Sequence, residues 1–176
     1  MTEIELEKTY LARSLPSGLE SFLSKQVKDI YLPLNAKHPT LRIRQQGDRY
    51  EITKKQPMRG KDSSEMFEYT IDLTEEEFVA LEQTPGKKLH KIRYYYDHHG
   101  TQAEIDIFQD DLLGLVLIDF EFAAVADKDN FQMPEFCLTD VTQDECFAGG
   151  VLCGKKYTDV ETHLDELGYN KLLYGN

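Results

Sequence analysis

The chain has 176 residues, enough for one domain with a sizeable core, and we expect residues 1–176 to form that single domain. No apolar run reaches the roughly 18 residues that a membrane-spanning helix needs, and the acidic start, MTEIELEK, does not fit a signal peptide, so we expect a cytoplasmic protein without membrane contact. The net charge of −12 repels phosphate backbones and argues against nucleic acid as a partner.

Most of the chain consists of short segments in which polar and apolar residues alternate, which is the period of a β-strand. The dipeptides Gly47-Asp48 and His99-Gly100 separate such segments and are typical of hairpin turns. The predicted strands, in chain order, cover residues 3–11, 27–32, 41–45, 49–55, 66–73, 89–96, 102–108, 114–123 and 136–142.

Helices are fewer. Residues 17–25 are the weakest candidate. Residues 74–84 are a better one, because Thr74 and Glu77 form a capping box ahead of an apolar stretch. Residues 157–173 place apolar side chains on one face and predict a C-terminal amphipathic helix. Sparse helices among sequential strands favour an α+β fold, a closed antiparallel β-barrel of about eight strands with flanking helices.

Several predicted strands have one apolar face and one charged face, and each charged face has a single sign. The acidic faces carry Glu3, Glu5 and Glu7 beside Thr9, then Glu104 and Asp106, then Asp119 and Glu121. The basic faces carry Arg42 and Arg44, then Lys91 and Arg93. Faces that only meet solvent usually mix signs, because like charges on neighbouring side chains repel each other.

Segregated charge suggests that these faces point at something charged. Carboxylates two residues apart on a strand project together and can hold Mg²⁺ or Mn²⁺ through oxygen. Arginines with the same spacing present forked donors suited to phosphate oxygens. A closed barrel would gather both kinds of side chain inside, while the apolar faces pack outward.

The order of these motifs resembles the CYTH domain, or triphosphate tunnel metalloenzyme, family, which includes class IV adenylyl cyclases, thiamine triphosphatases and inorganic triphosphatases. ELEKTYL is similar to the family's ExExK strand, and LRIRQQGDRYEITKK to its paired-arginine hairpin that ends in lysine. The segments FEYTIDL, KIRY, AEIDIF, GLVLIDFEF and PEFCLTDVT then follow in the family's order.

The resemblance implies a role for each matching residue. Glu5 and Glu7 match the family's metal-binding pair, and they would act in catalysis together with Lys91 and Arg93. The implied phosphate-binding residues are Arg42, Arg44, Lys54, Lys91 and Arg93, with Lys55 as the alternative to Lys54 if the hairpin shifts by one residue. The acidic tunnel positions, which serve metals or support the basic residues, are Glu68, Glu104, Asp106, Asp119, Glu121 and Asp140.

The chain departs from the family at the ExExK lysine. If Glu5 and Glu7 are the acidic pair, the lysine position holds Thr9, and this alignment is preferred because Tyr10 then matches the family's aromatic residue. If Glu3 and Glu5 are the pair, the position holds Glu7. Two smaller departures are Thr70, where the family has a second acid after Glu68, and Asp140, where it usually has Glu.

Other motifs are weaker. Asp97-His98-His99 could bind a metal, but its place beside Gly100 favours a solvated turn. The run from Tyr94 to Tyr96 could stack on a base, although strand packing explains it as well. Cys137, Cys146 and Cys153 match no zinc spacing and are expected to be buried thiols, and Cys153 lacks the His–acid arrangement of a thiol enzyme.

The function implied by the resemblance is metal-dependent hydrolysis of inorganic triphosphate or a nucleoside triphosphate inside the barrel, with Mg²⁺ or Mn²⁺ as cofactor. Two alternatives stay open. One is cyclisation of ATP to cyclic AMP in the same site. The other is a non-catalytic binder of polyphosphate or nucleotide, because the ExExK lysine is absent. The expected partner is a triphosphate-containing small molecule, and a homodimer is a further possibility.

Overall fold

The computed structural model describes residues 2–58 and 62–174, with side chains from residue 4 onward. Nine strands in these ranges form one antiparallel sheet in the order β5-β4-β3-β2-β6-β7-β8-β1-β9. The strands are β1 (Thr2–Ala12), β2 (Ser24–Leu32), β3 (Leu41–Gln46), β4 (Arg49–Pro57), β5 (Glu65–Leu73), β6 (Lys87–His98), β7 (Thr101–Phe108), β8 (Val116–Glu121) and β9 (Cys137–Asp140).

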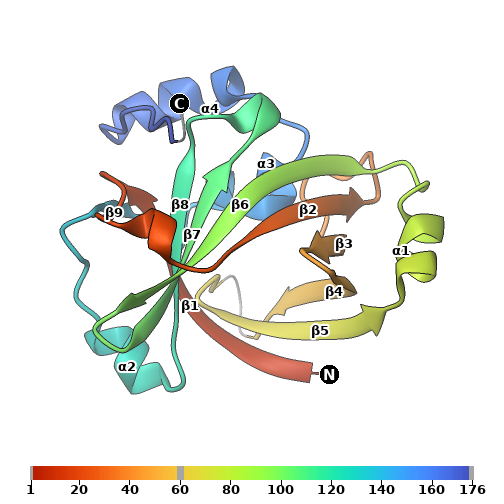
Figure 1. Cartoon of the computed structure of the whole chain (residues 1–176), viewed down its shortest axis with the longest axis horizontal. Helices are drawn as coiled ribbons and strands as arrows, with labels where there is room; N and C mark the ends of the chain where they lie inside the picture. Colours follow the sequence, from red (N-terminus) through yellow and green to blue (C-terminus); the bar gives the residue numbers. More distant parts are fainter. Residues whose placement is uncertain (1, 59–61, 175–176) are drawn as a thin grey trace.

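The long first strand closes the sheet into a barrel (Figure 1). The first part of β1, Thr2–Leu6, pairs with β5, and the next part, Glu7–Leu11, pairs with β8. Strand β9 pairs with the end of β1 beyond this closure. Because closure removes both free edges, the eight strands β1–β8 enclose an interior, and the predicted antiparallel barrel is confirmed.

The two predicted hairpin turns are confirmed. Gln46 pairs with Arg49, so Gly47-Asp48 is a two-residue turn, and Gly47 has a φ of 63°. His98 pairs with Thr101 across His99-Gly100, where both turn residues have positive φ values of 54° and 85°. Turns of this kind match the right-handed twist of the strands they join and set the pairing of the neighbouring strands.

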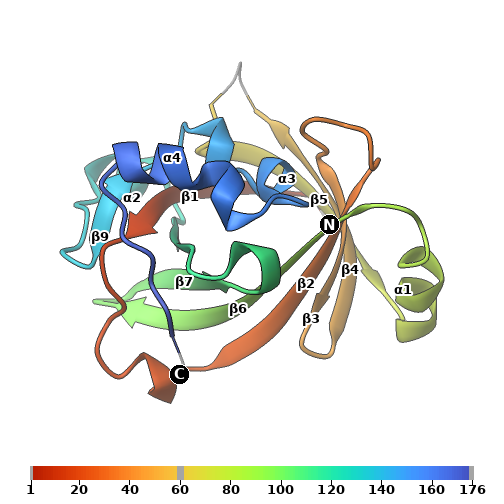
Figure 2. The ribbon, with the colours of Figure 1, turned by 90° about the horizontal axis from the view of Figure 1, so that it is seen from above.

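Four helices and three short 3₁₀ turns accompany the barrel in the described ranges. They are α1 (Glu75–Leu81), α2 (Val125–Asn130), α3 (Gly149–Leu152), α4 (Tyr157–Glu166), η1 (Leu19–Ser21), η2 (Asp110–Leu112) and η3 (Glu145–Phe147). Helix α1 begins as predicted, since Thr74 and Glu77 form a reciprocal capping box. It lies on the opposite side of the molecule from α2, while α3 and α4 lie together along another face (Figures 1 and 2).

Two predicted helices need correction. The helix over residues 17–25 is wrong, because Gly18 takes a φ of 74°, only η1 forms, and Ser24 already pairs with Tyr94 in the sheet. The C-terminal helix exists, but it ends at Glu166 and not at residue 173. Gly168 has a φ of 73° there, and the Tyr169 hydroxyl donates to the carbonyl of Gly114 at 2.8 Å, so tertiary contacts end the helix.

Two hydrophobic clusters hold the barrel. One joins inward-facing Leu11, Leu89 and Leu117 to Val160 and Leu164 of α4. The other covers the outer face of β7 and β8, where Ile105, Ile118 and Phe120 are fully buried. The inward-facing leucines of the first cluster therefore pack on the side of the barrel that α4 covers. Across the described helices, no segment is both long and apolar enough to cross a membrane. The expectation of one domain over residues 1–176 stays a prediction.

Candidate functional site: a charged cavity inside the barrel

The barrel encloses a cavity of about 730 Å³, which we call the tunnel cavity. Its charged lining residues are Glu5, Glu7, Asp29, Arg42, Arg44, Arg49, Glu51, Lys55, Glu68, Asp72, Lys91, Arg93, Glu104, Asp106, Asp119 and Glu121. Ten of these are acidic and six are basic, an excess of four acids. The predicted gathering of both signs inside the barrel is therefore observed.

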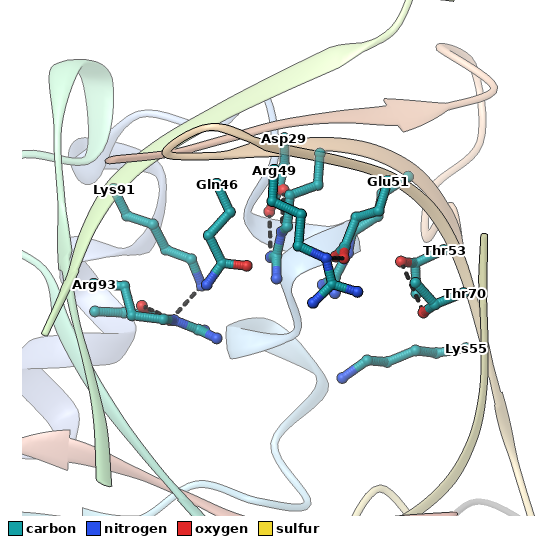
Figure 3. A network of polar contacts seen from close by, with 12 residues as sticks. Asp29, Gln46, Arg49, Glu51, Thr53, Lys55, Thr70, Lys91 and Arg93 are labelled. Atoms are coloured by element: carbon teal, nitrogen blue, oxygen red, sulfur yellow. Dashed lines mark hydrogen bonds and ion pairs between the residues drawn. The ribbon is translucent and has the colours of Figure 1, made fainter. Parts of the chain in front are cut away.

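Strand alternation and pairing explain which residues face inward. Directly opposed residues point to the same side of a sheet, and inward positions recur every second residue. Arg44 opposes Glu51 and Glu51 opposes Asp72, so one row of inward side chains crosses β3, β4 and β5. Figure 3 shows Arg49, Glu51, Thr53, Thr70 and Lys55 directed into the same space. The hairpin turns thus decide the composition of the cavity wall.

Arg44 is held by Asp29, its opposite residue on β2. The guanidinium donates two hydrogen bonds to the carboxylate, at 2.7 Å from Nε and 2.8 Å from Nη2, and Asp29 is only 2% exposed. Burial by itself would raise the pKa of Asp29, but the charge and hydrogen bonds of Arg44 hold it well below its usual range. Because the carboxylate stays ionised, Arg44 keeps one fixed orientation.

Lys91 and Arg93 share Asp106 on β7. Arg93 donates to its two oxygens at 2.7 and 2.6 Å, Lys91 donates to one of them, and Arg93 also donates to Glu104. Burial opposes ionisation of Asp106, yet the two cations lower its pKa to about 2. Lys91, Arg93 and Asp106 form a buried network in which each charge has a partner, and Figure 3 shows the two cations lying next to each other.

Lys55 and Arg42 form a third group with acids from β1 and β5. Lys55 donates to Glu5 and lies 3.4 Å from Glu68, whereas Arg42 lies 3.9 Å from Glu68. The Nε of Arg42 is buried and has no hydrogen-bond partner among the described residues. An unsatisfied buried donor is costly unless an acceptor arrives. Arg42 thus keeps one hydrogen-bond donor that no described residue satisfies.

The placement predicted for Lys54 is wrong. Lys54 is exposed and opposes Leu41 and Tyr69 on the outer face of the sheet. Lys55, one residue later, lines the tunnel cavity. The alternation has a period of two, so a one-residue difference in the hairpin exchanges the inner and outer lysine.

Glu7 and Glu121 oppose each other on β1 and β8. Burial, followed by the charge of Glu5, raises the pKa of Glu7 well above its usual range. Desolvation and the charges of Glu104 and Glu5 raise the pKa of Glu121 to about 7. Crowded carboxylates with too few cations are the expected condition of a site that takes up a positive ion.

The donor set of this acidic region suits a hard divalent cation, because all its donors are carboxylate oxygens. As they lie, however, no group of three or more His, Cys, Asp or Glu side chains in the described part of the chain is arranged to hold a metal. Glu5 pairs with Lys55, and Thr9 donates to Asp119 at 2.7 Å. The residues therefore fit a metal in chemistry and charge, and binding would require side-chain movement.

Asp140 does not line the tunnel cavity, so its placement as a metal-binding residue there is wrong. It is exposed, opposes Tyr10 on the outer side of β1, and accepts hydrogen bonds from the Thr142 N–H at 2.9 Å and hydroxyl at 2.5 Å. The carboxylate stabilises the turn after β9. The side chain of Glu3, the other candidate in the alternative alignment, lies outside the described residues.

Several tunnel residues were not singled out from the sequence. They are Asp29, Gln46, Arg49, Glu51 and Asp72. Asp29 was the most detectable, because it is the one acid in the predicted strand over residues 27–32 and Ile30-Tyr31-Leu32 follow it. Its significance depends on pairing with Arg44, which only the three-dimensional pairing of β2 and β3 reveals.

The weaker motifs have structural explanations. Asp97 accepts a hydrogen bond from the Gly100 N–H at 3.1 Å, as expected for a turn. Tyr94 and Tyr96 pack in the outer cluster, whereas Tyr95 lines the tunnel. Cys137, Cys146 and Cys153 are not in disulfides, and burial raises the pKa of Cys153 to about 11, which disfavours a reactive thiolate.

Comparisons with known proteins agree with this geometry. The CYTH domain model matches residues 3–129. The chain is 29% identical over 149 residues to the inorganic triphosphatase of Nitrosomonas europaea, covering 84% of this chain and 95% of that protein. A crystal structure of an inorganic triphosphatase has a TM-score of 0.63 at 25% identity, covering 86% of this chain and 95% of its own. A Bacillus halodurans structure suggested to be an adenylate cyclase shares the fold, with a TM-score of 0.54 at 14% identity, covering 99% and 95%.

Proposed function

The chain belongs to the CYTH domain family, as its motifs predicted, and on that premise we propose that it is a metal-dependent triphosphatase. The observation that carries the proposal is the convergence of Arg42, Arg44, Lys55, Lys91 and Arg93 in one cavity with the acidic pair Glu5 and Glu7. Its similarity to an inorganic triphosphatase supports the same reaction class. The substrate would be inorganic triphosphate or a nucleoside triphosphate.

The basic residues bind and extend the phosphate chain. Arg44 and Arg93 are oriented beforehand by Asp29 and Asp106, so they lose little freedom when an anion binds. Arg42, with its unpaired Nε, would make a new bond to a phosphate oxygen. Donors fixed before the reaction stabilise the charge that develops in phosphoryl transfer, which is where most of the catalysis in such reactions arises.

The acidic region serves the other half of the chemistry. Mg²⁺ or Mn²⁺ held by Glu5, Glu7 and Glu121 would neutralise phosphate charge and activate a water. Asp106 is enclosed by Lys91 and Arg93, which assigns it to the support of those cations. Glu104 and Asp119, beside Arg93, lie between the two regions and would orient its guanidinium toward the phosphates.

The adjacent lysines on β4 offer a matched test. Lys55→Ala removes a cation from the tunnel, so the affinity for inorganic triphosphate should fall by about 1.5–3 kcal/mol, roughly ten- to a hundredfold in Kd. Lys54→Ala removes the same ammonium group from the exposed outer face of the sheet, so the affinity for triphosphate and the rate of hydrolysis should stay unchanged. Calorimetric titration, together with phosphate, pyrophosphate and cyclic nucleotide assays in Mg²⁺ and Mn²⁺, makes the measurement. Equal effects of the two variants would contradict the proposed site.

A second candidate is a binder that does not turn its ligand over. The observation that favours it is Thr9, which stands at the family's lysine position in the preferred alignment and whose hydroxyl donates to Asp119 at 2.7 Å. Tight binding of a triphosphate without release of phosphate, pyrophosphate or cyclic nucleotide would establish this alternative. Release of cyclic AMP from ATP would instead identify a cyclase.

A further inference from the structure

Lys128, on α2, is a buried charge that the proposed reaction does not use. Its side chain is 5% exposed, and the ammonium group donates hydrogen bonds to the Ser64 hydroxyl and to a Glu65 carboxylate oxygen, both at 2.8 Å. A buried lysine is costly unless it is paired and hydrogen-bonded, and these two partners meet that cost. We call Lys128, Ser64 and Glu65 the clamp, because they join the helix that follows β8 to the start of β5.

The clamp spans the place where the barrel closes. Strand β1 pairs with β5 up to Leu6, which opposes Glu65, and it pairs with β8 from Glu7 onward. Glu5 and Glu7 line the tunnel, so Leu6 between them faces outward, and Glu65 opposite it does the same. Lys128 therefore reaches Glu65 on the outer side of β1, and the clamp ties β5 to the end of β8 across that strand.

The clamp is also connected to the backbone of the acidic pair. The Glu7 N–H donates to the Ser64 carbonyl at 3.2 Å, so Ser64 contacts Lys128 through its hydroxyl and β1 through its backbone. Ser64 is 7% exposed, and its hydroxyl and N–H both donate to Asp62, at 2.7 and 2.9 Å. Ser64 is thus held from several directions, and it passes the position of Lys128 on to Glu7.

The clamp fixes geometry more than it adds stability. Replacing a buried ion pair with uncharged groups of similar size is often neutral for stability, whereas hydrogen bonds are directional and fix how two strands lie relative to each other. Glu5 and Glu7 flank Leu6, so a small shift of β1 at the closure moves both inward carboxylates. A displacement of about 1 Å in a site can cost roughly 10²-fold in activity.

We propose that Lys128 is a positioning residue that fixes β1 at Glu5 and Glu7, the carboxylates assigned above to the divalent cation. Lys128 does not line the tunnel cavity, and it acts through Ser64 and the hydrogen bond from the Glu7 N–H. This inference rests on the proposed function, from which it takes the role of the two carboxylates. Loss of the ammonium group should therefore weaken metal binding, while the phosphate-binding residues on β3, β4 and β6 keep their geometry.

Two variants remove the clamp, and a third is a matched control. Lys128→Met removes the ammonium group and leaves Glu65 without its cation. Adding Glu65→Gln removes that unpaired charge, so the double variant should unfold at a urea concentration close to the native one, and it keeps the test valid if Lys128→Met does not fold. Lys87→Met is the control, because Lys87 donates to the Ala36 carbonyl at 2.7 Å but does not line the tunnel cavity.

The decisive measurements need no turnover. Mn²⁺ titration followed by electron paramagnetic resonance should give a Kd about tenfold or more above the native value in the clamp variants, and the native value in Lys87→Met. Calorimetry in excess chelator should give a Kd for inorganic triphosphate within about twofold of the native value. Amide hydrogen exchange at Glu7 should be at least about tenfold faster in the clamp variants, while Ile105 on β7 exchanges as in the native protein.

The outcomes separate this inference from the proposed function. If the double variant keeps the native Mn²⁺ affinity or the native exchange rate at Glu7, Lys128 serves only the fold and the inference is overturned. Equal losses of Mn²⁺ and triphosphate affinity would indicate general loosening of the barrel and would overturn it as well. If no triphosphate is hydrolysed but the changes in Mn²⁺ affinity and exchange occur, triphosphatase activity is refuted and the positioning role of Lys128 stands.

Discussion

Arg42 and Arg44 lie two residues apart on β3 and both face the tunnel, yet their surroundings differ. Arg44 is locked by two hydrogen bonds to buried Asp29. Arg42 lies 3.9 Å from Glu68, interacts with the Tyr31 hydroxyl and has an unpaired Nε. Arg42 is therefore placed for anion binding, whereas Arg44 also supports the fold.

This difference predicts opposite outcomes for the two alanine variants. Arg42→Ala should weaken triphosphate binding by about 1.5–3 kcal/mol and leave stability nearly unchanged. Arg44→Ala should lower the free energy of unfolding by about 3–5 kcal/mol, because it leaves Asp29 buried and unpaired. Calorimetry and urea unfolding separate the effects. Adding Asp29→Leu to Arg44→Met serves as the control, since removing both charges should restore much of the stability. Similar behaviour of the two alanine variants would contradict the assignment.

Glu121 predicts a pH dependence of stability. Its folded-state pKa of about 7 lies above the usual value of 4.5, so the folded protein holds this proton more tightly than the unfolded chain does. Ionisation between those two values therefore destabilises the folded state, with no cost below pH 4.5 and the full cost above about pH 7. Glu121→Gln should raise Tm relative to the native protein at pH 8, but not at pH 4.5. Glu161→Gln, on α4, is the control, and a Tm difference that is the same at both pH values would refute the assignment.

Thr9 tests the departure from the family motif. Glu5, Glu7 and Thr9 all line the tunnel, so both alignments of the ExExK motif remain compatible with the strand. In the preferred alignment, Thr9→Lys restores an ammonium group and should raise turnover, by up to the roughly 10²-fold that a positioned acid–base group contributes. In the alternative alignment Glu7→Lys would be the gaining variant. Steady-state rates decide between them, and if neither folded variant exceeds the native rate, a missing lysine does not limit activity.

At the level of elements, the capping box that starts α1 forms as the local sequence predicts. The Thr74 hydroxyl accepts from the Glu77 N–H at 3.2 Å, and the Glu77 carboxylate accepts from the Thr74 N–H at 2.8 Å. Thr74→Ala should lower the free energy of unfolding by about 1 kcal/mol without altering triphosphate affinity, because α1 lies outside the tunnel. Urea unfolding measures this, with Thr158→Ala on α4 as an exposed control. A loss of binding in Thr74→Ala would show that α1 is coupled to the site.

The alternating pattern predicts well that a strand occurs, but it predicts less well which of its residues face the barrel interior. Each predicted strand occurs, because alternation with a period of two depends only on neighbouring residues. Which lysine of the Lys54-Lys55 pair faces inward depended on the hairpin pairing that opposes Lys55 to Glu68. The helix predicted over residues 17–25 failed for a similar reason, since pairing with β6 outweighed local propensity.

For the whole molecule, the acidic excess of the tunnel predicts coupling between metal and triphosphate. Ten acids against six bases disfavour a bare polyanion, and a divalent cation corrects that imbalance. Mn²⁺ and inorganic triphosphate together, at about 100 times the Kd of their joint binding, should raise the free energy of unfolding by about 2.7 kcal/mol. Either ligand alone at the same concentration should raise it by less. Thermal unfolding measures this, with a chelator control. Equal stabilisation in excess chelator would contradict the metal requirement.

The sequence by itself determined the strand and turn pattern, the single sign of each charged face and the family, because all three depend on residues close together in the chain or on their order. Tertiary structure alone decided that Asp29 holds Arg44, that Lys55 replaces Lys54, and that Asp140 lies outside the tunnel. It also revealed a second cavity beside the tunnel, whose walls come from segments far apart in the chain. Those features arise from strand pairing and barrel closure, which bring together residues that no local pattern connects.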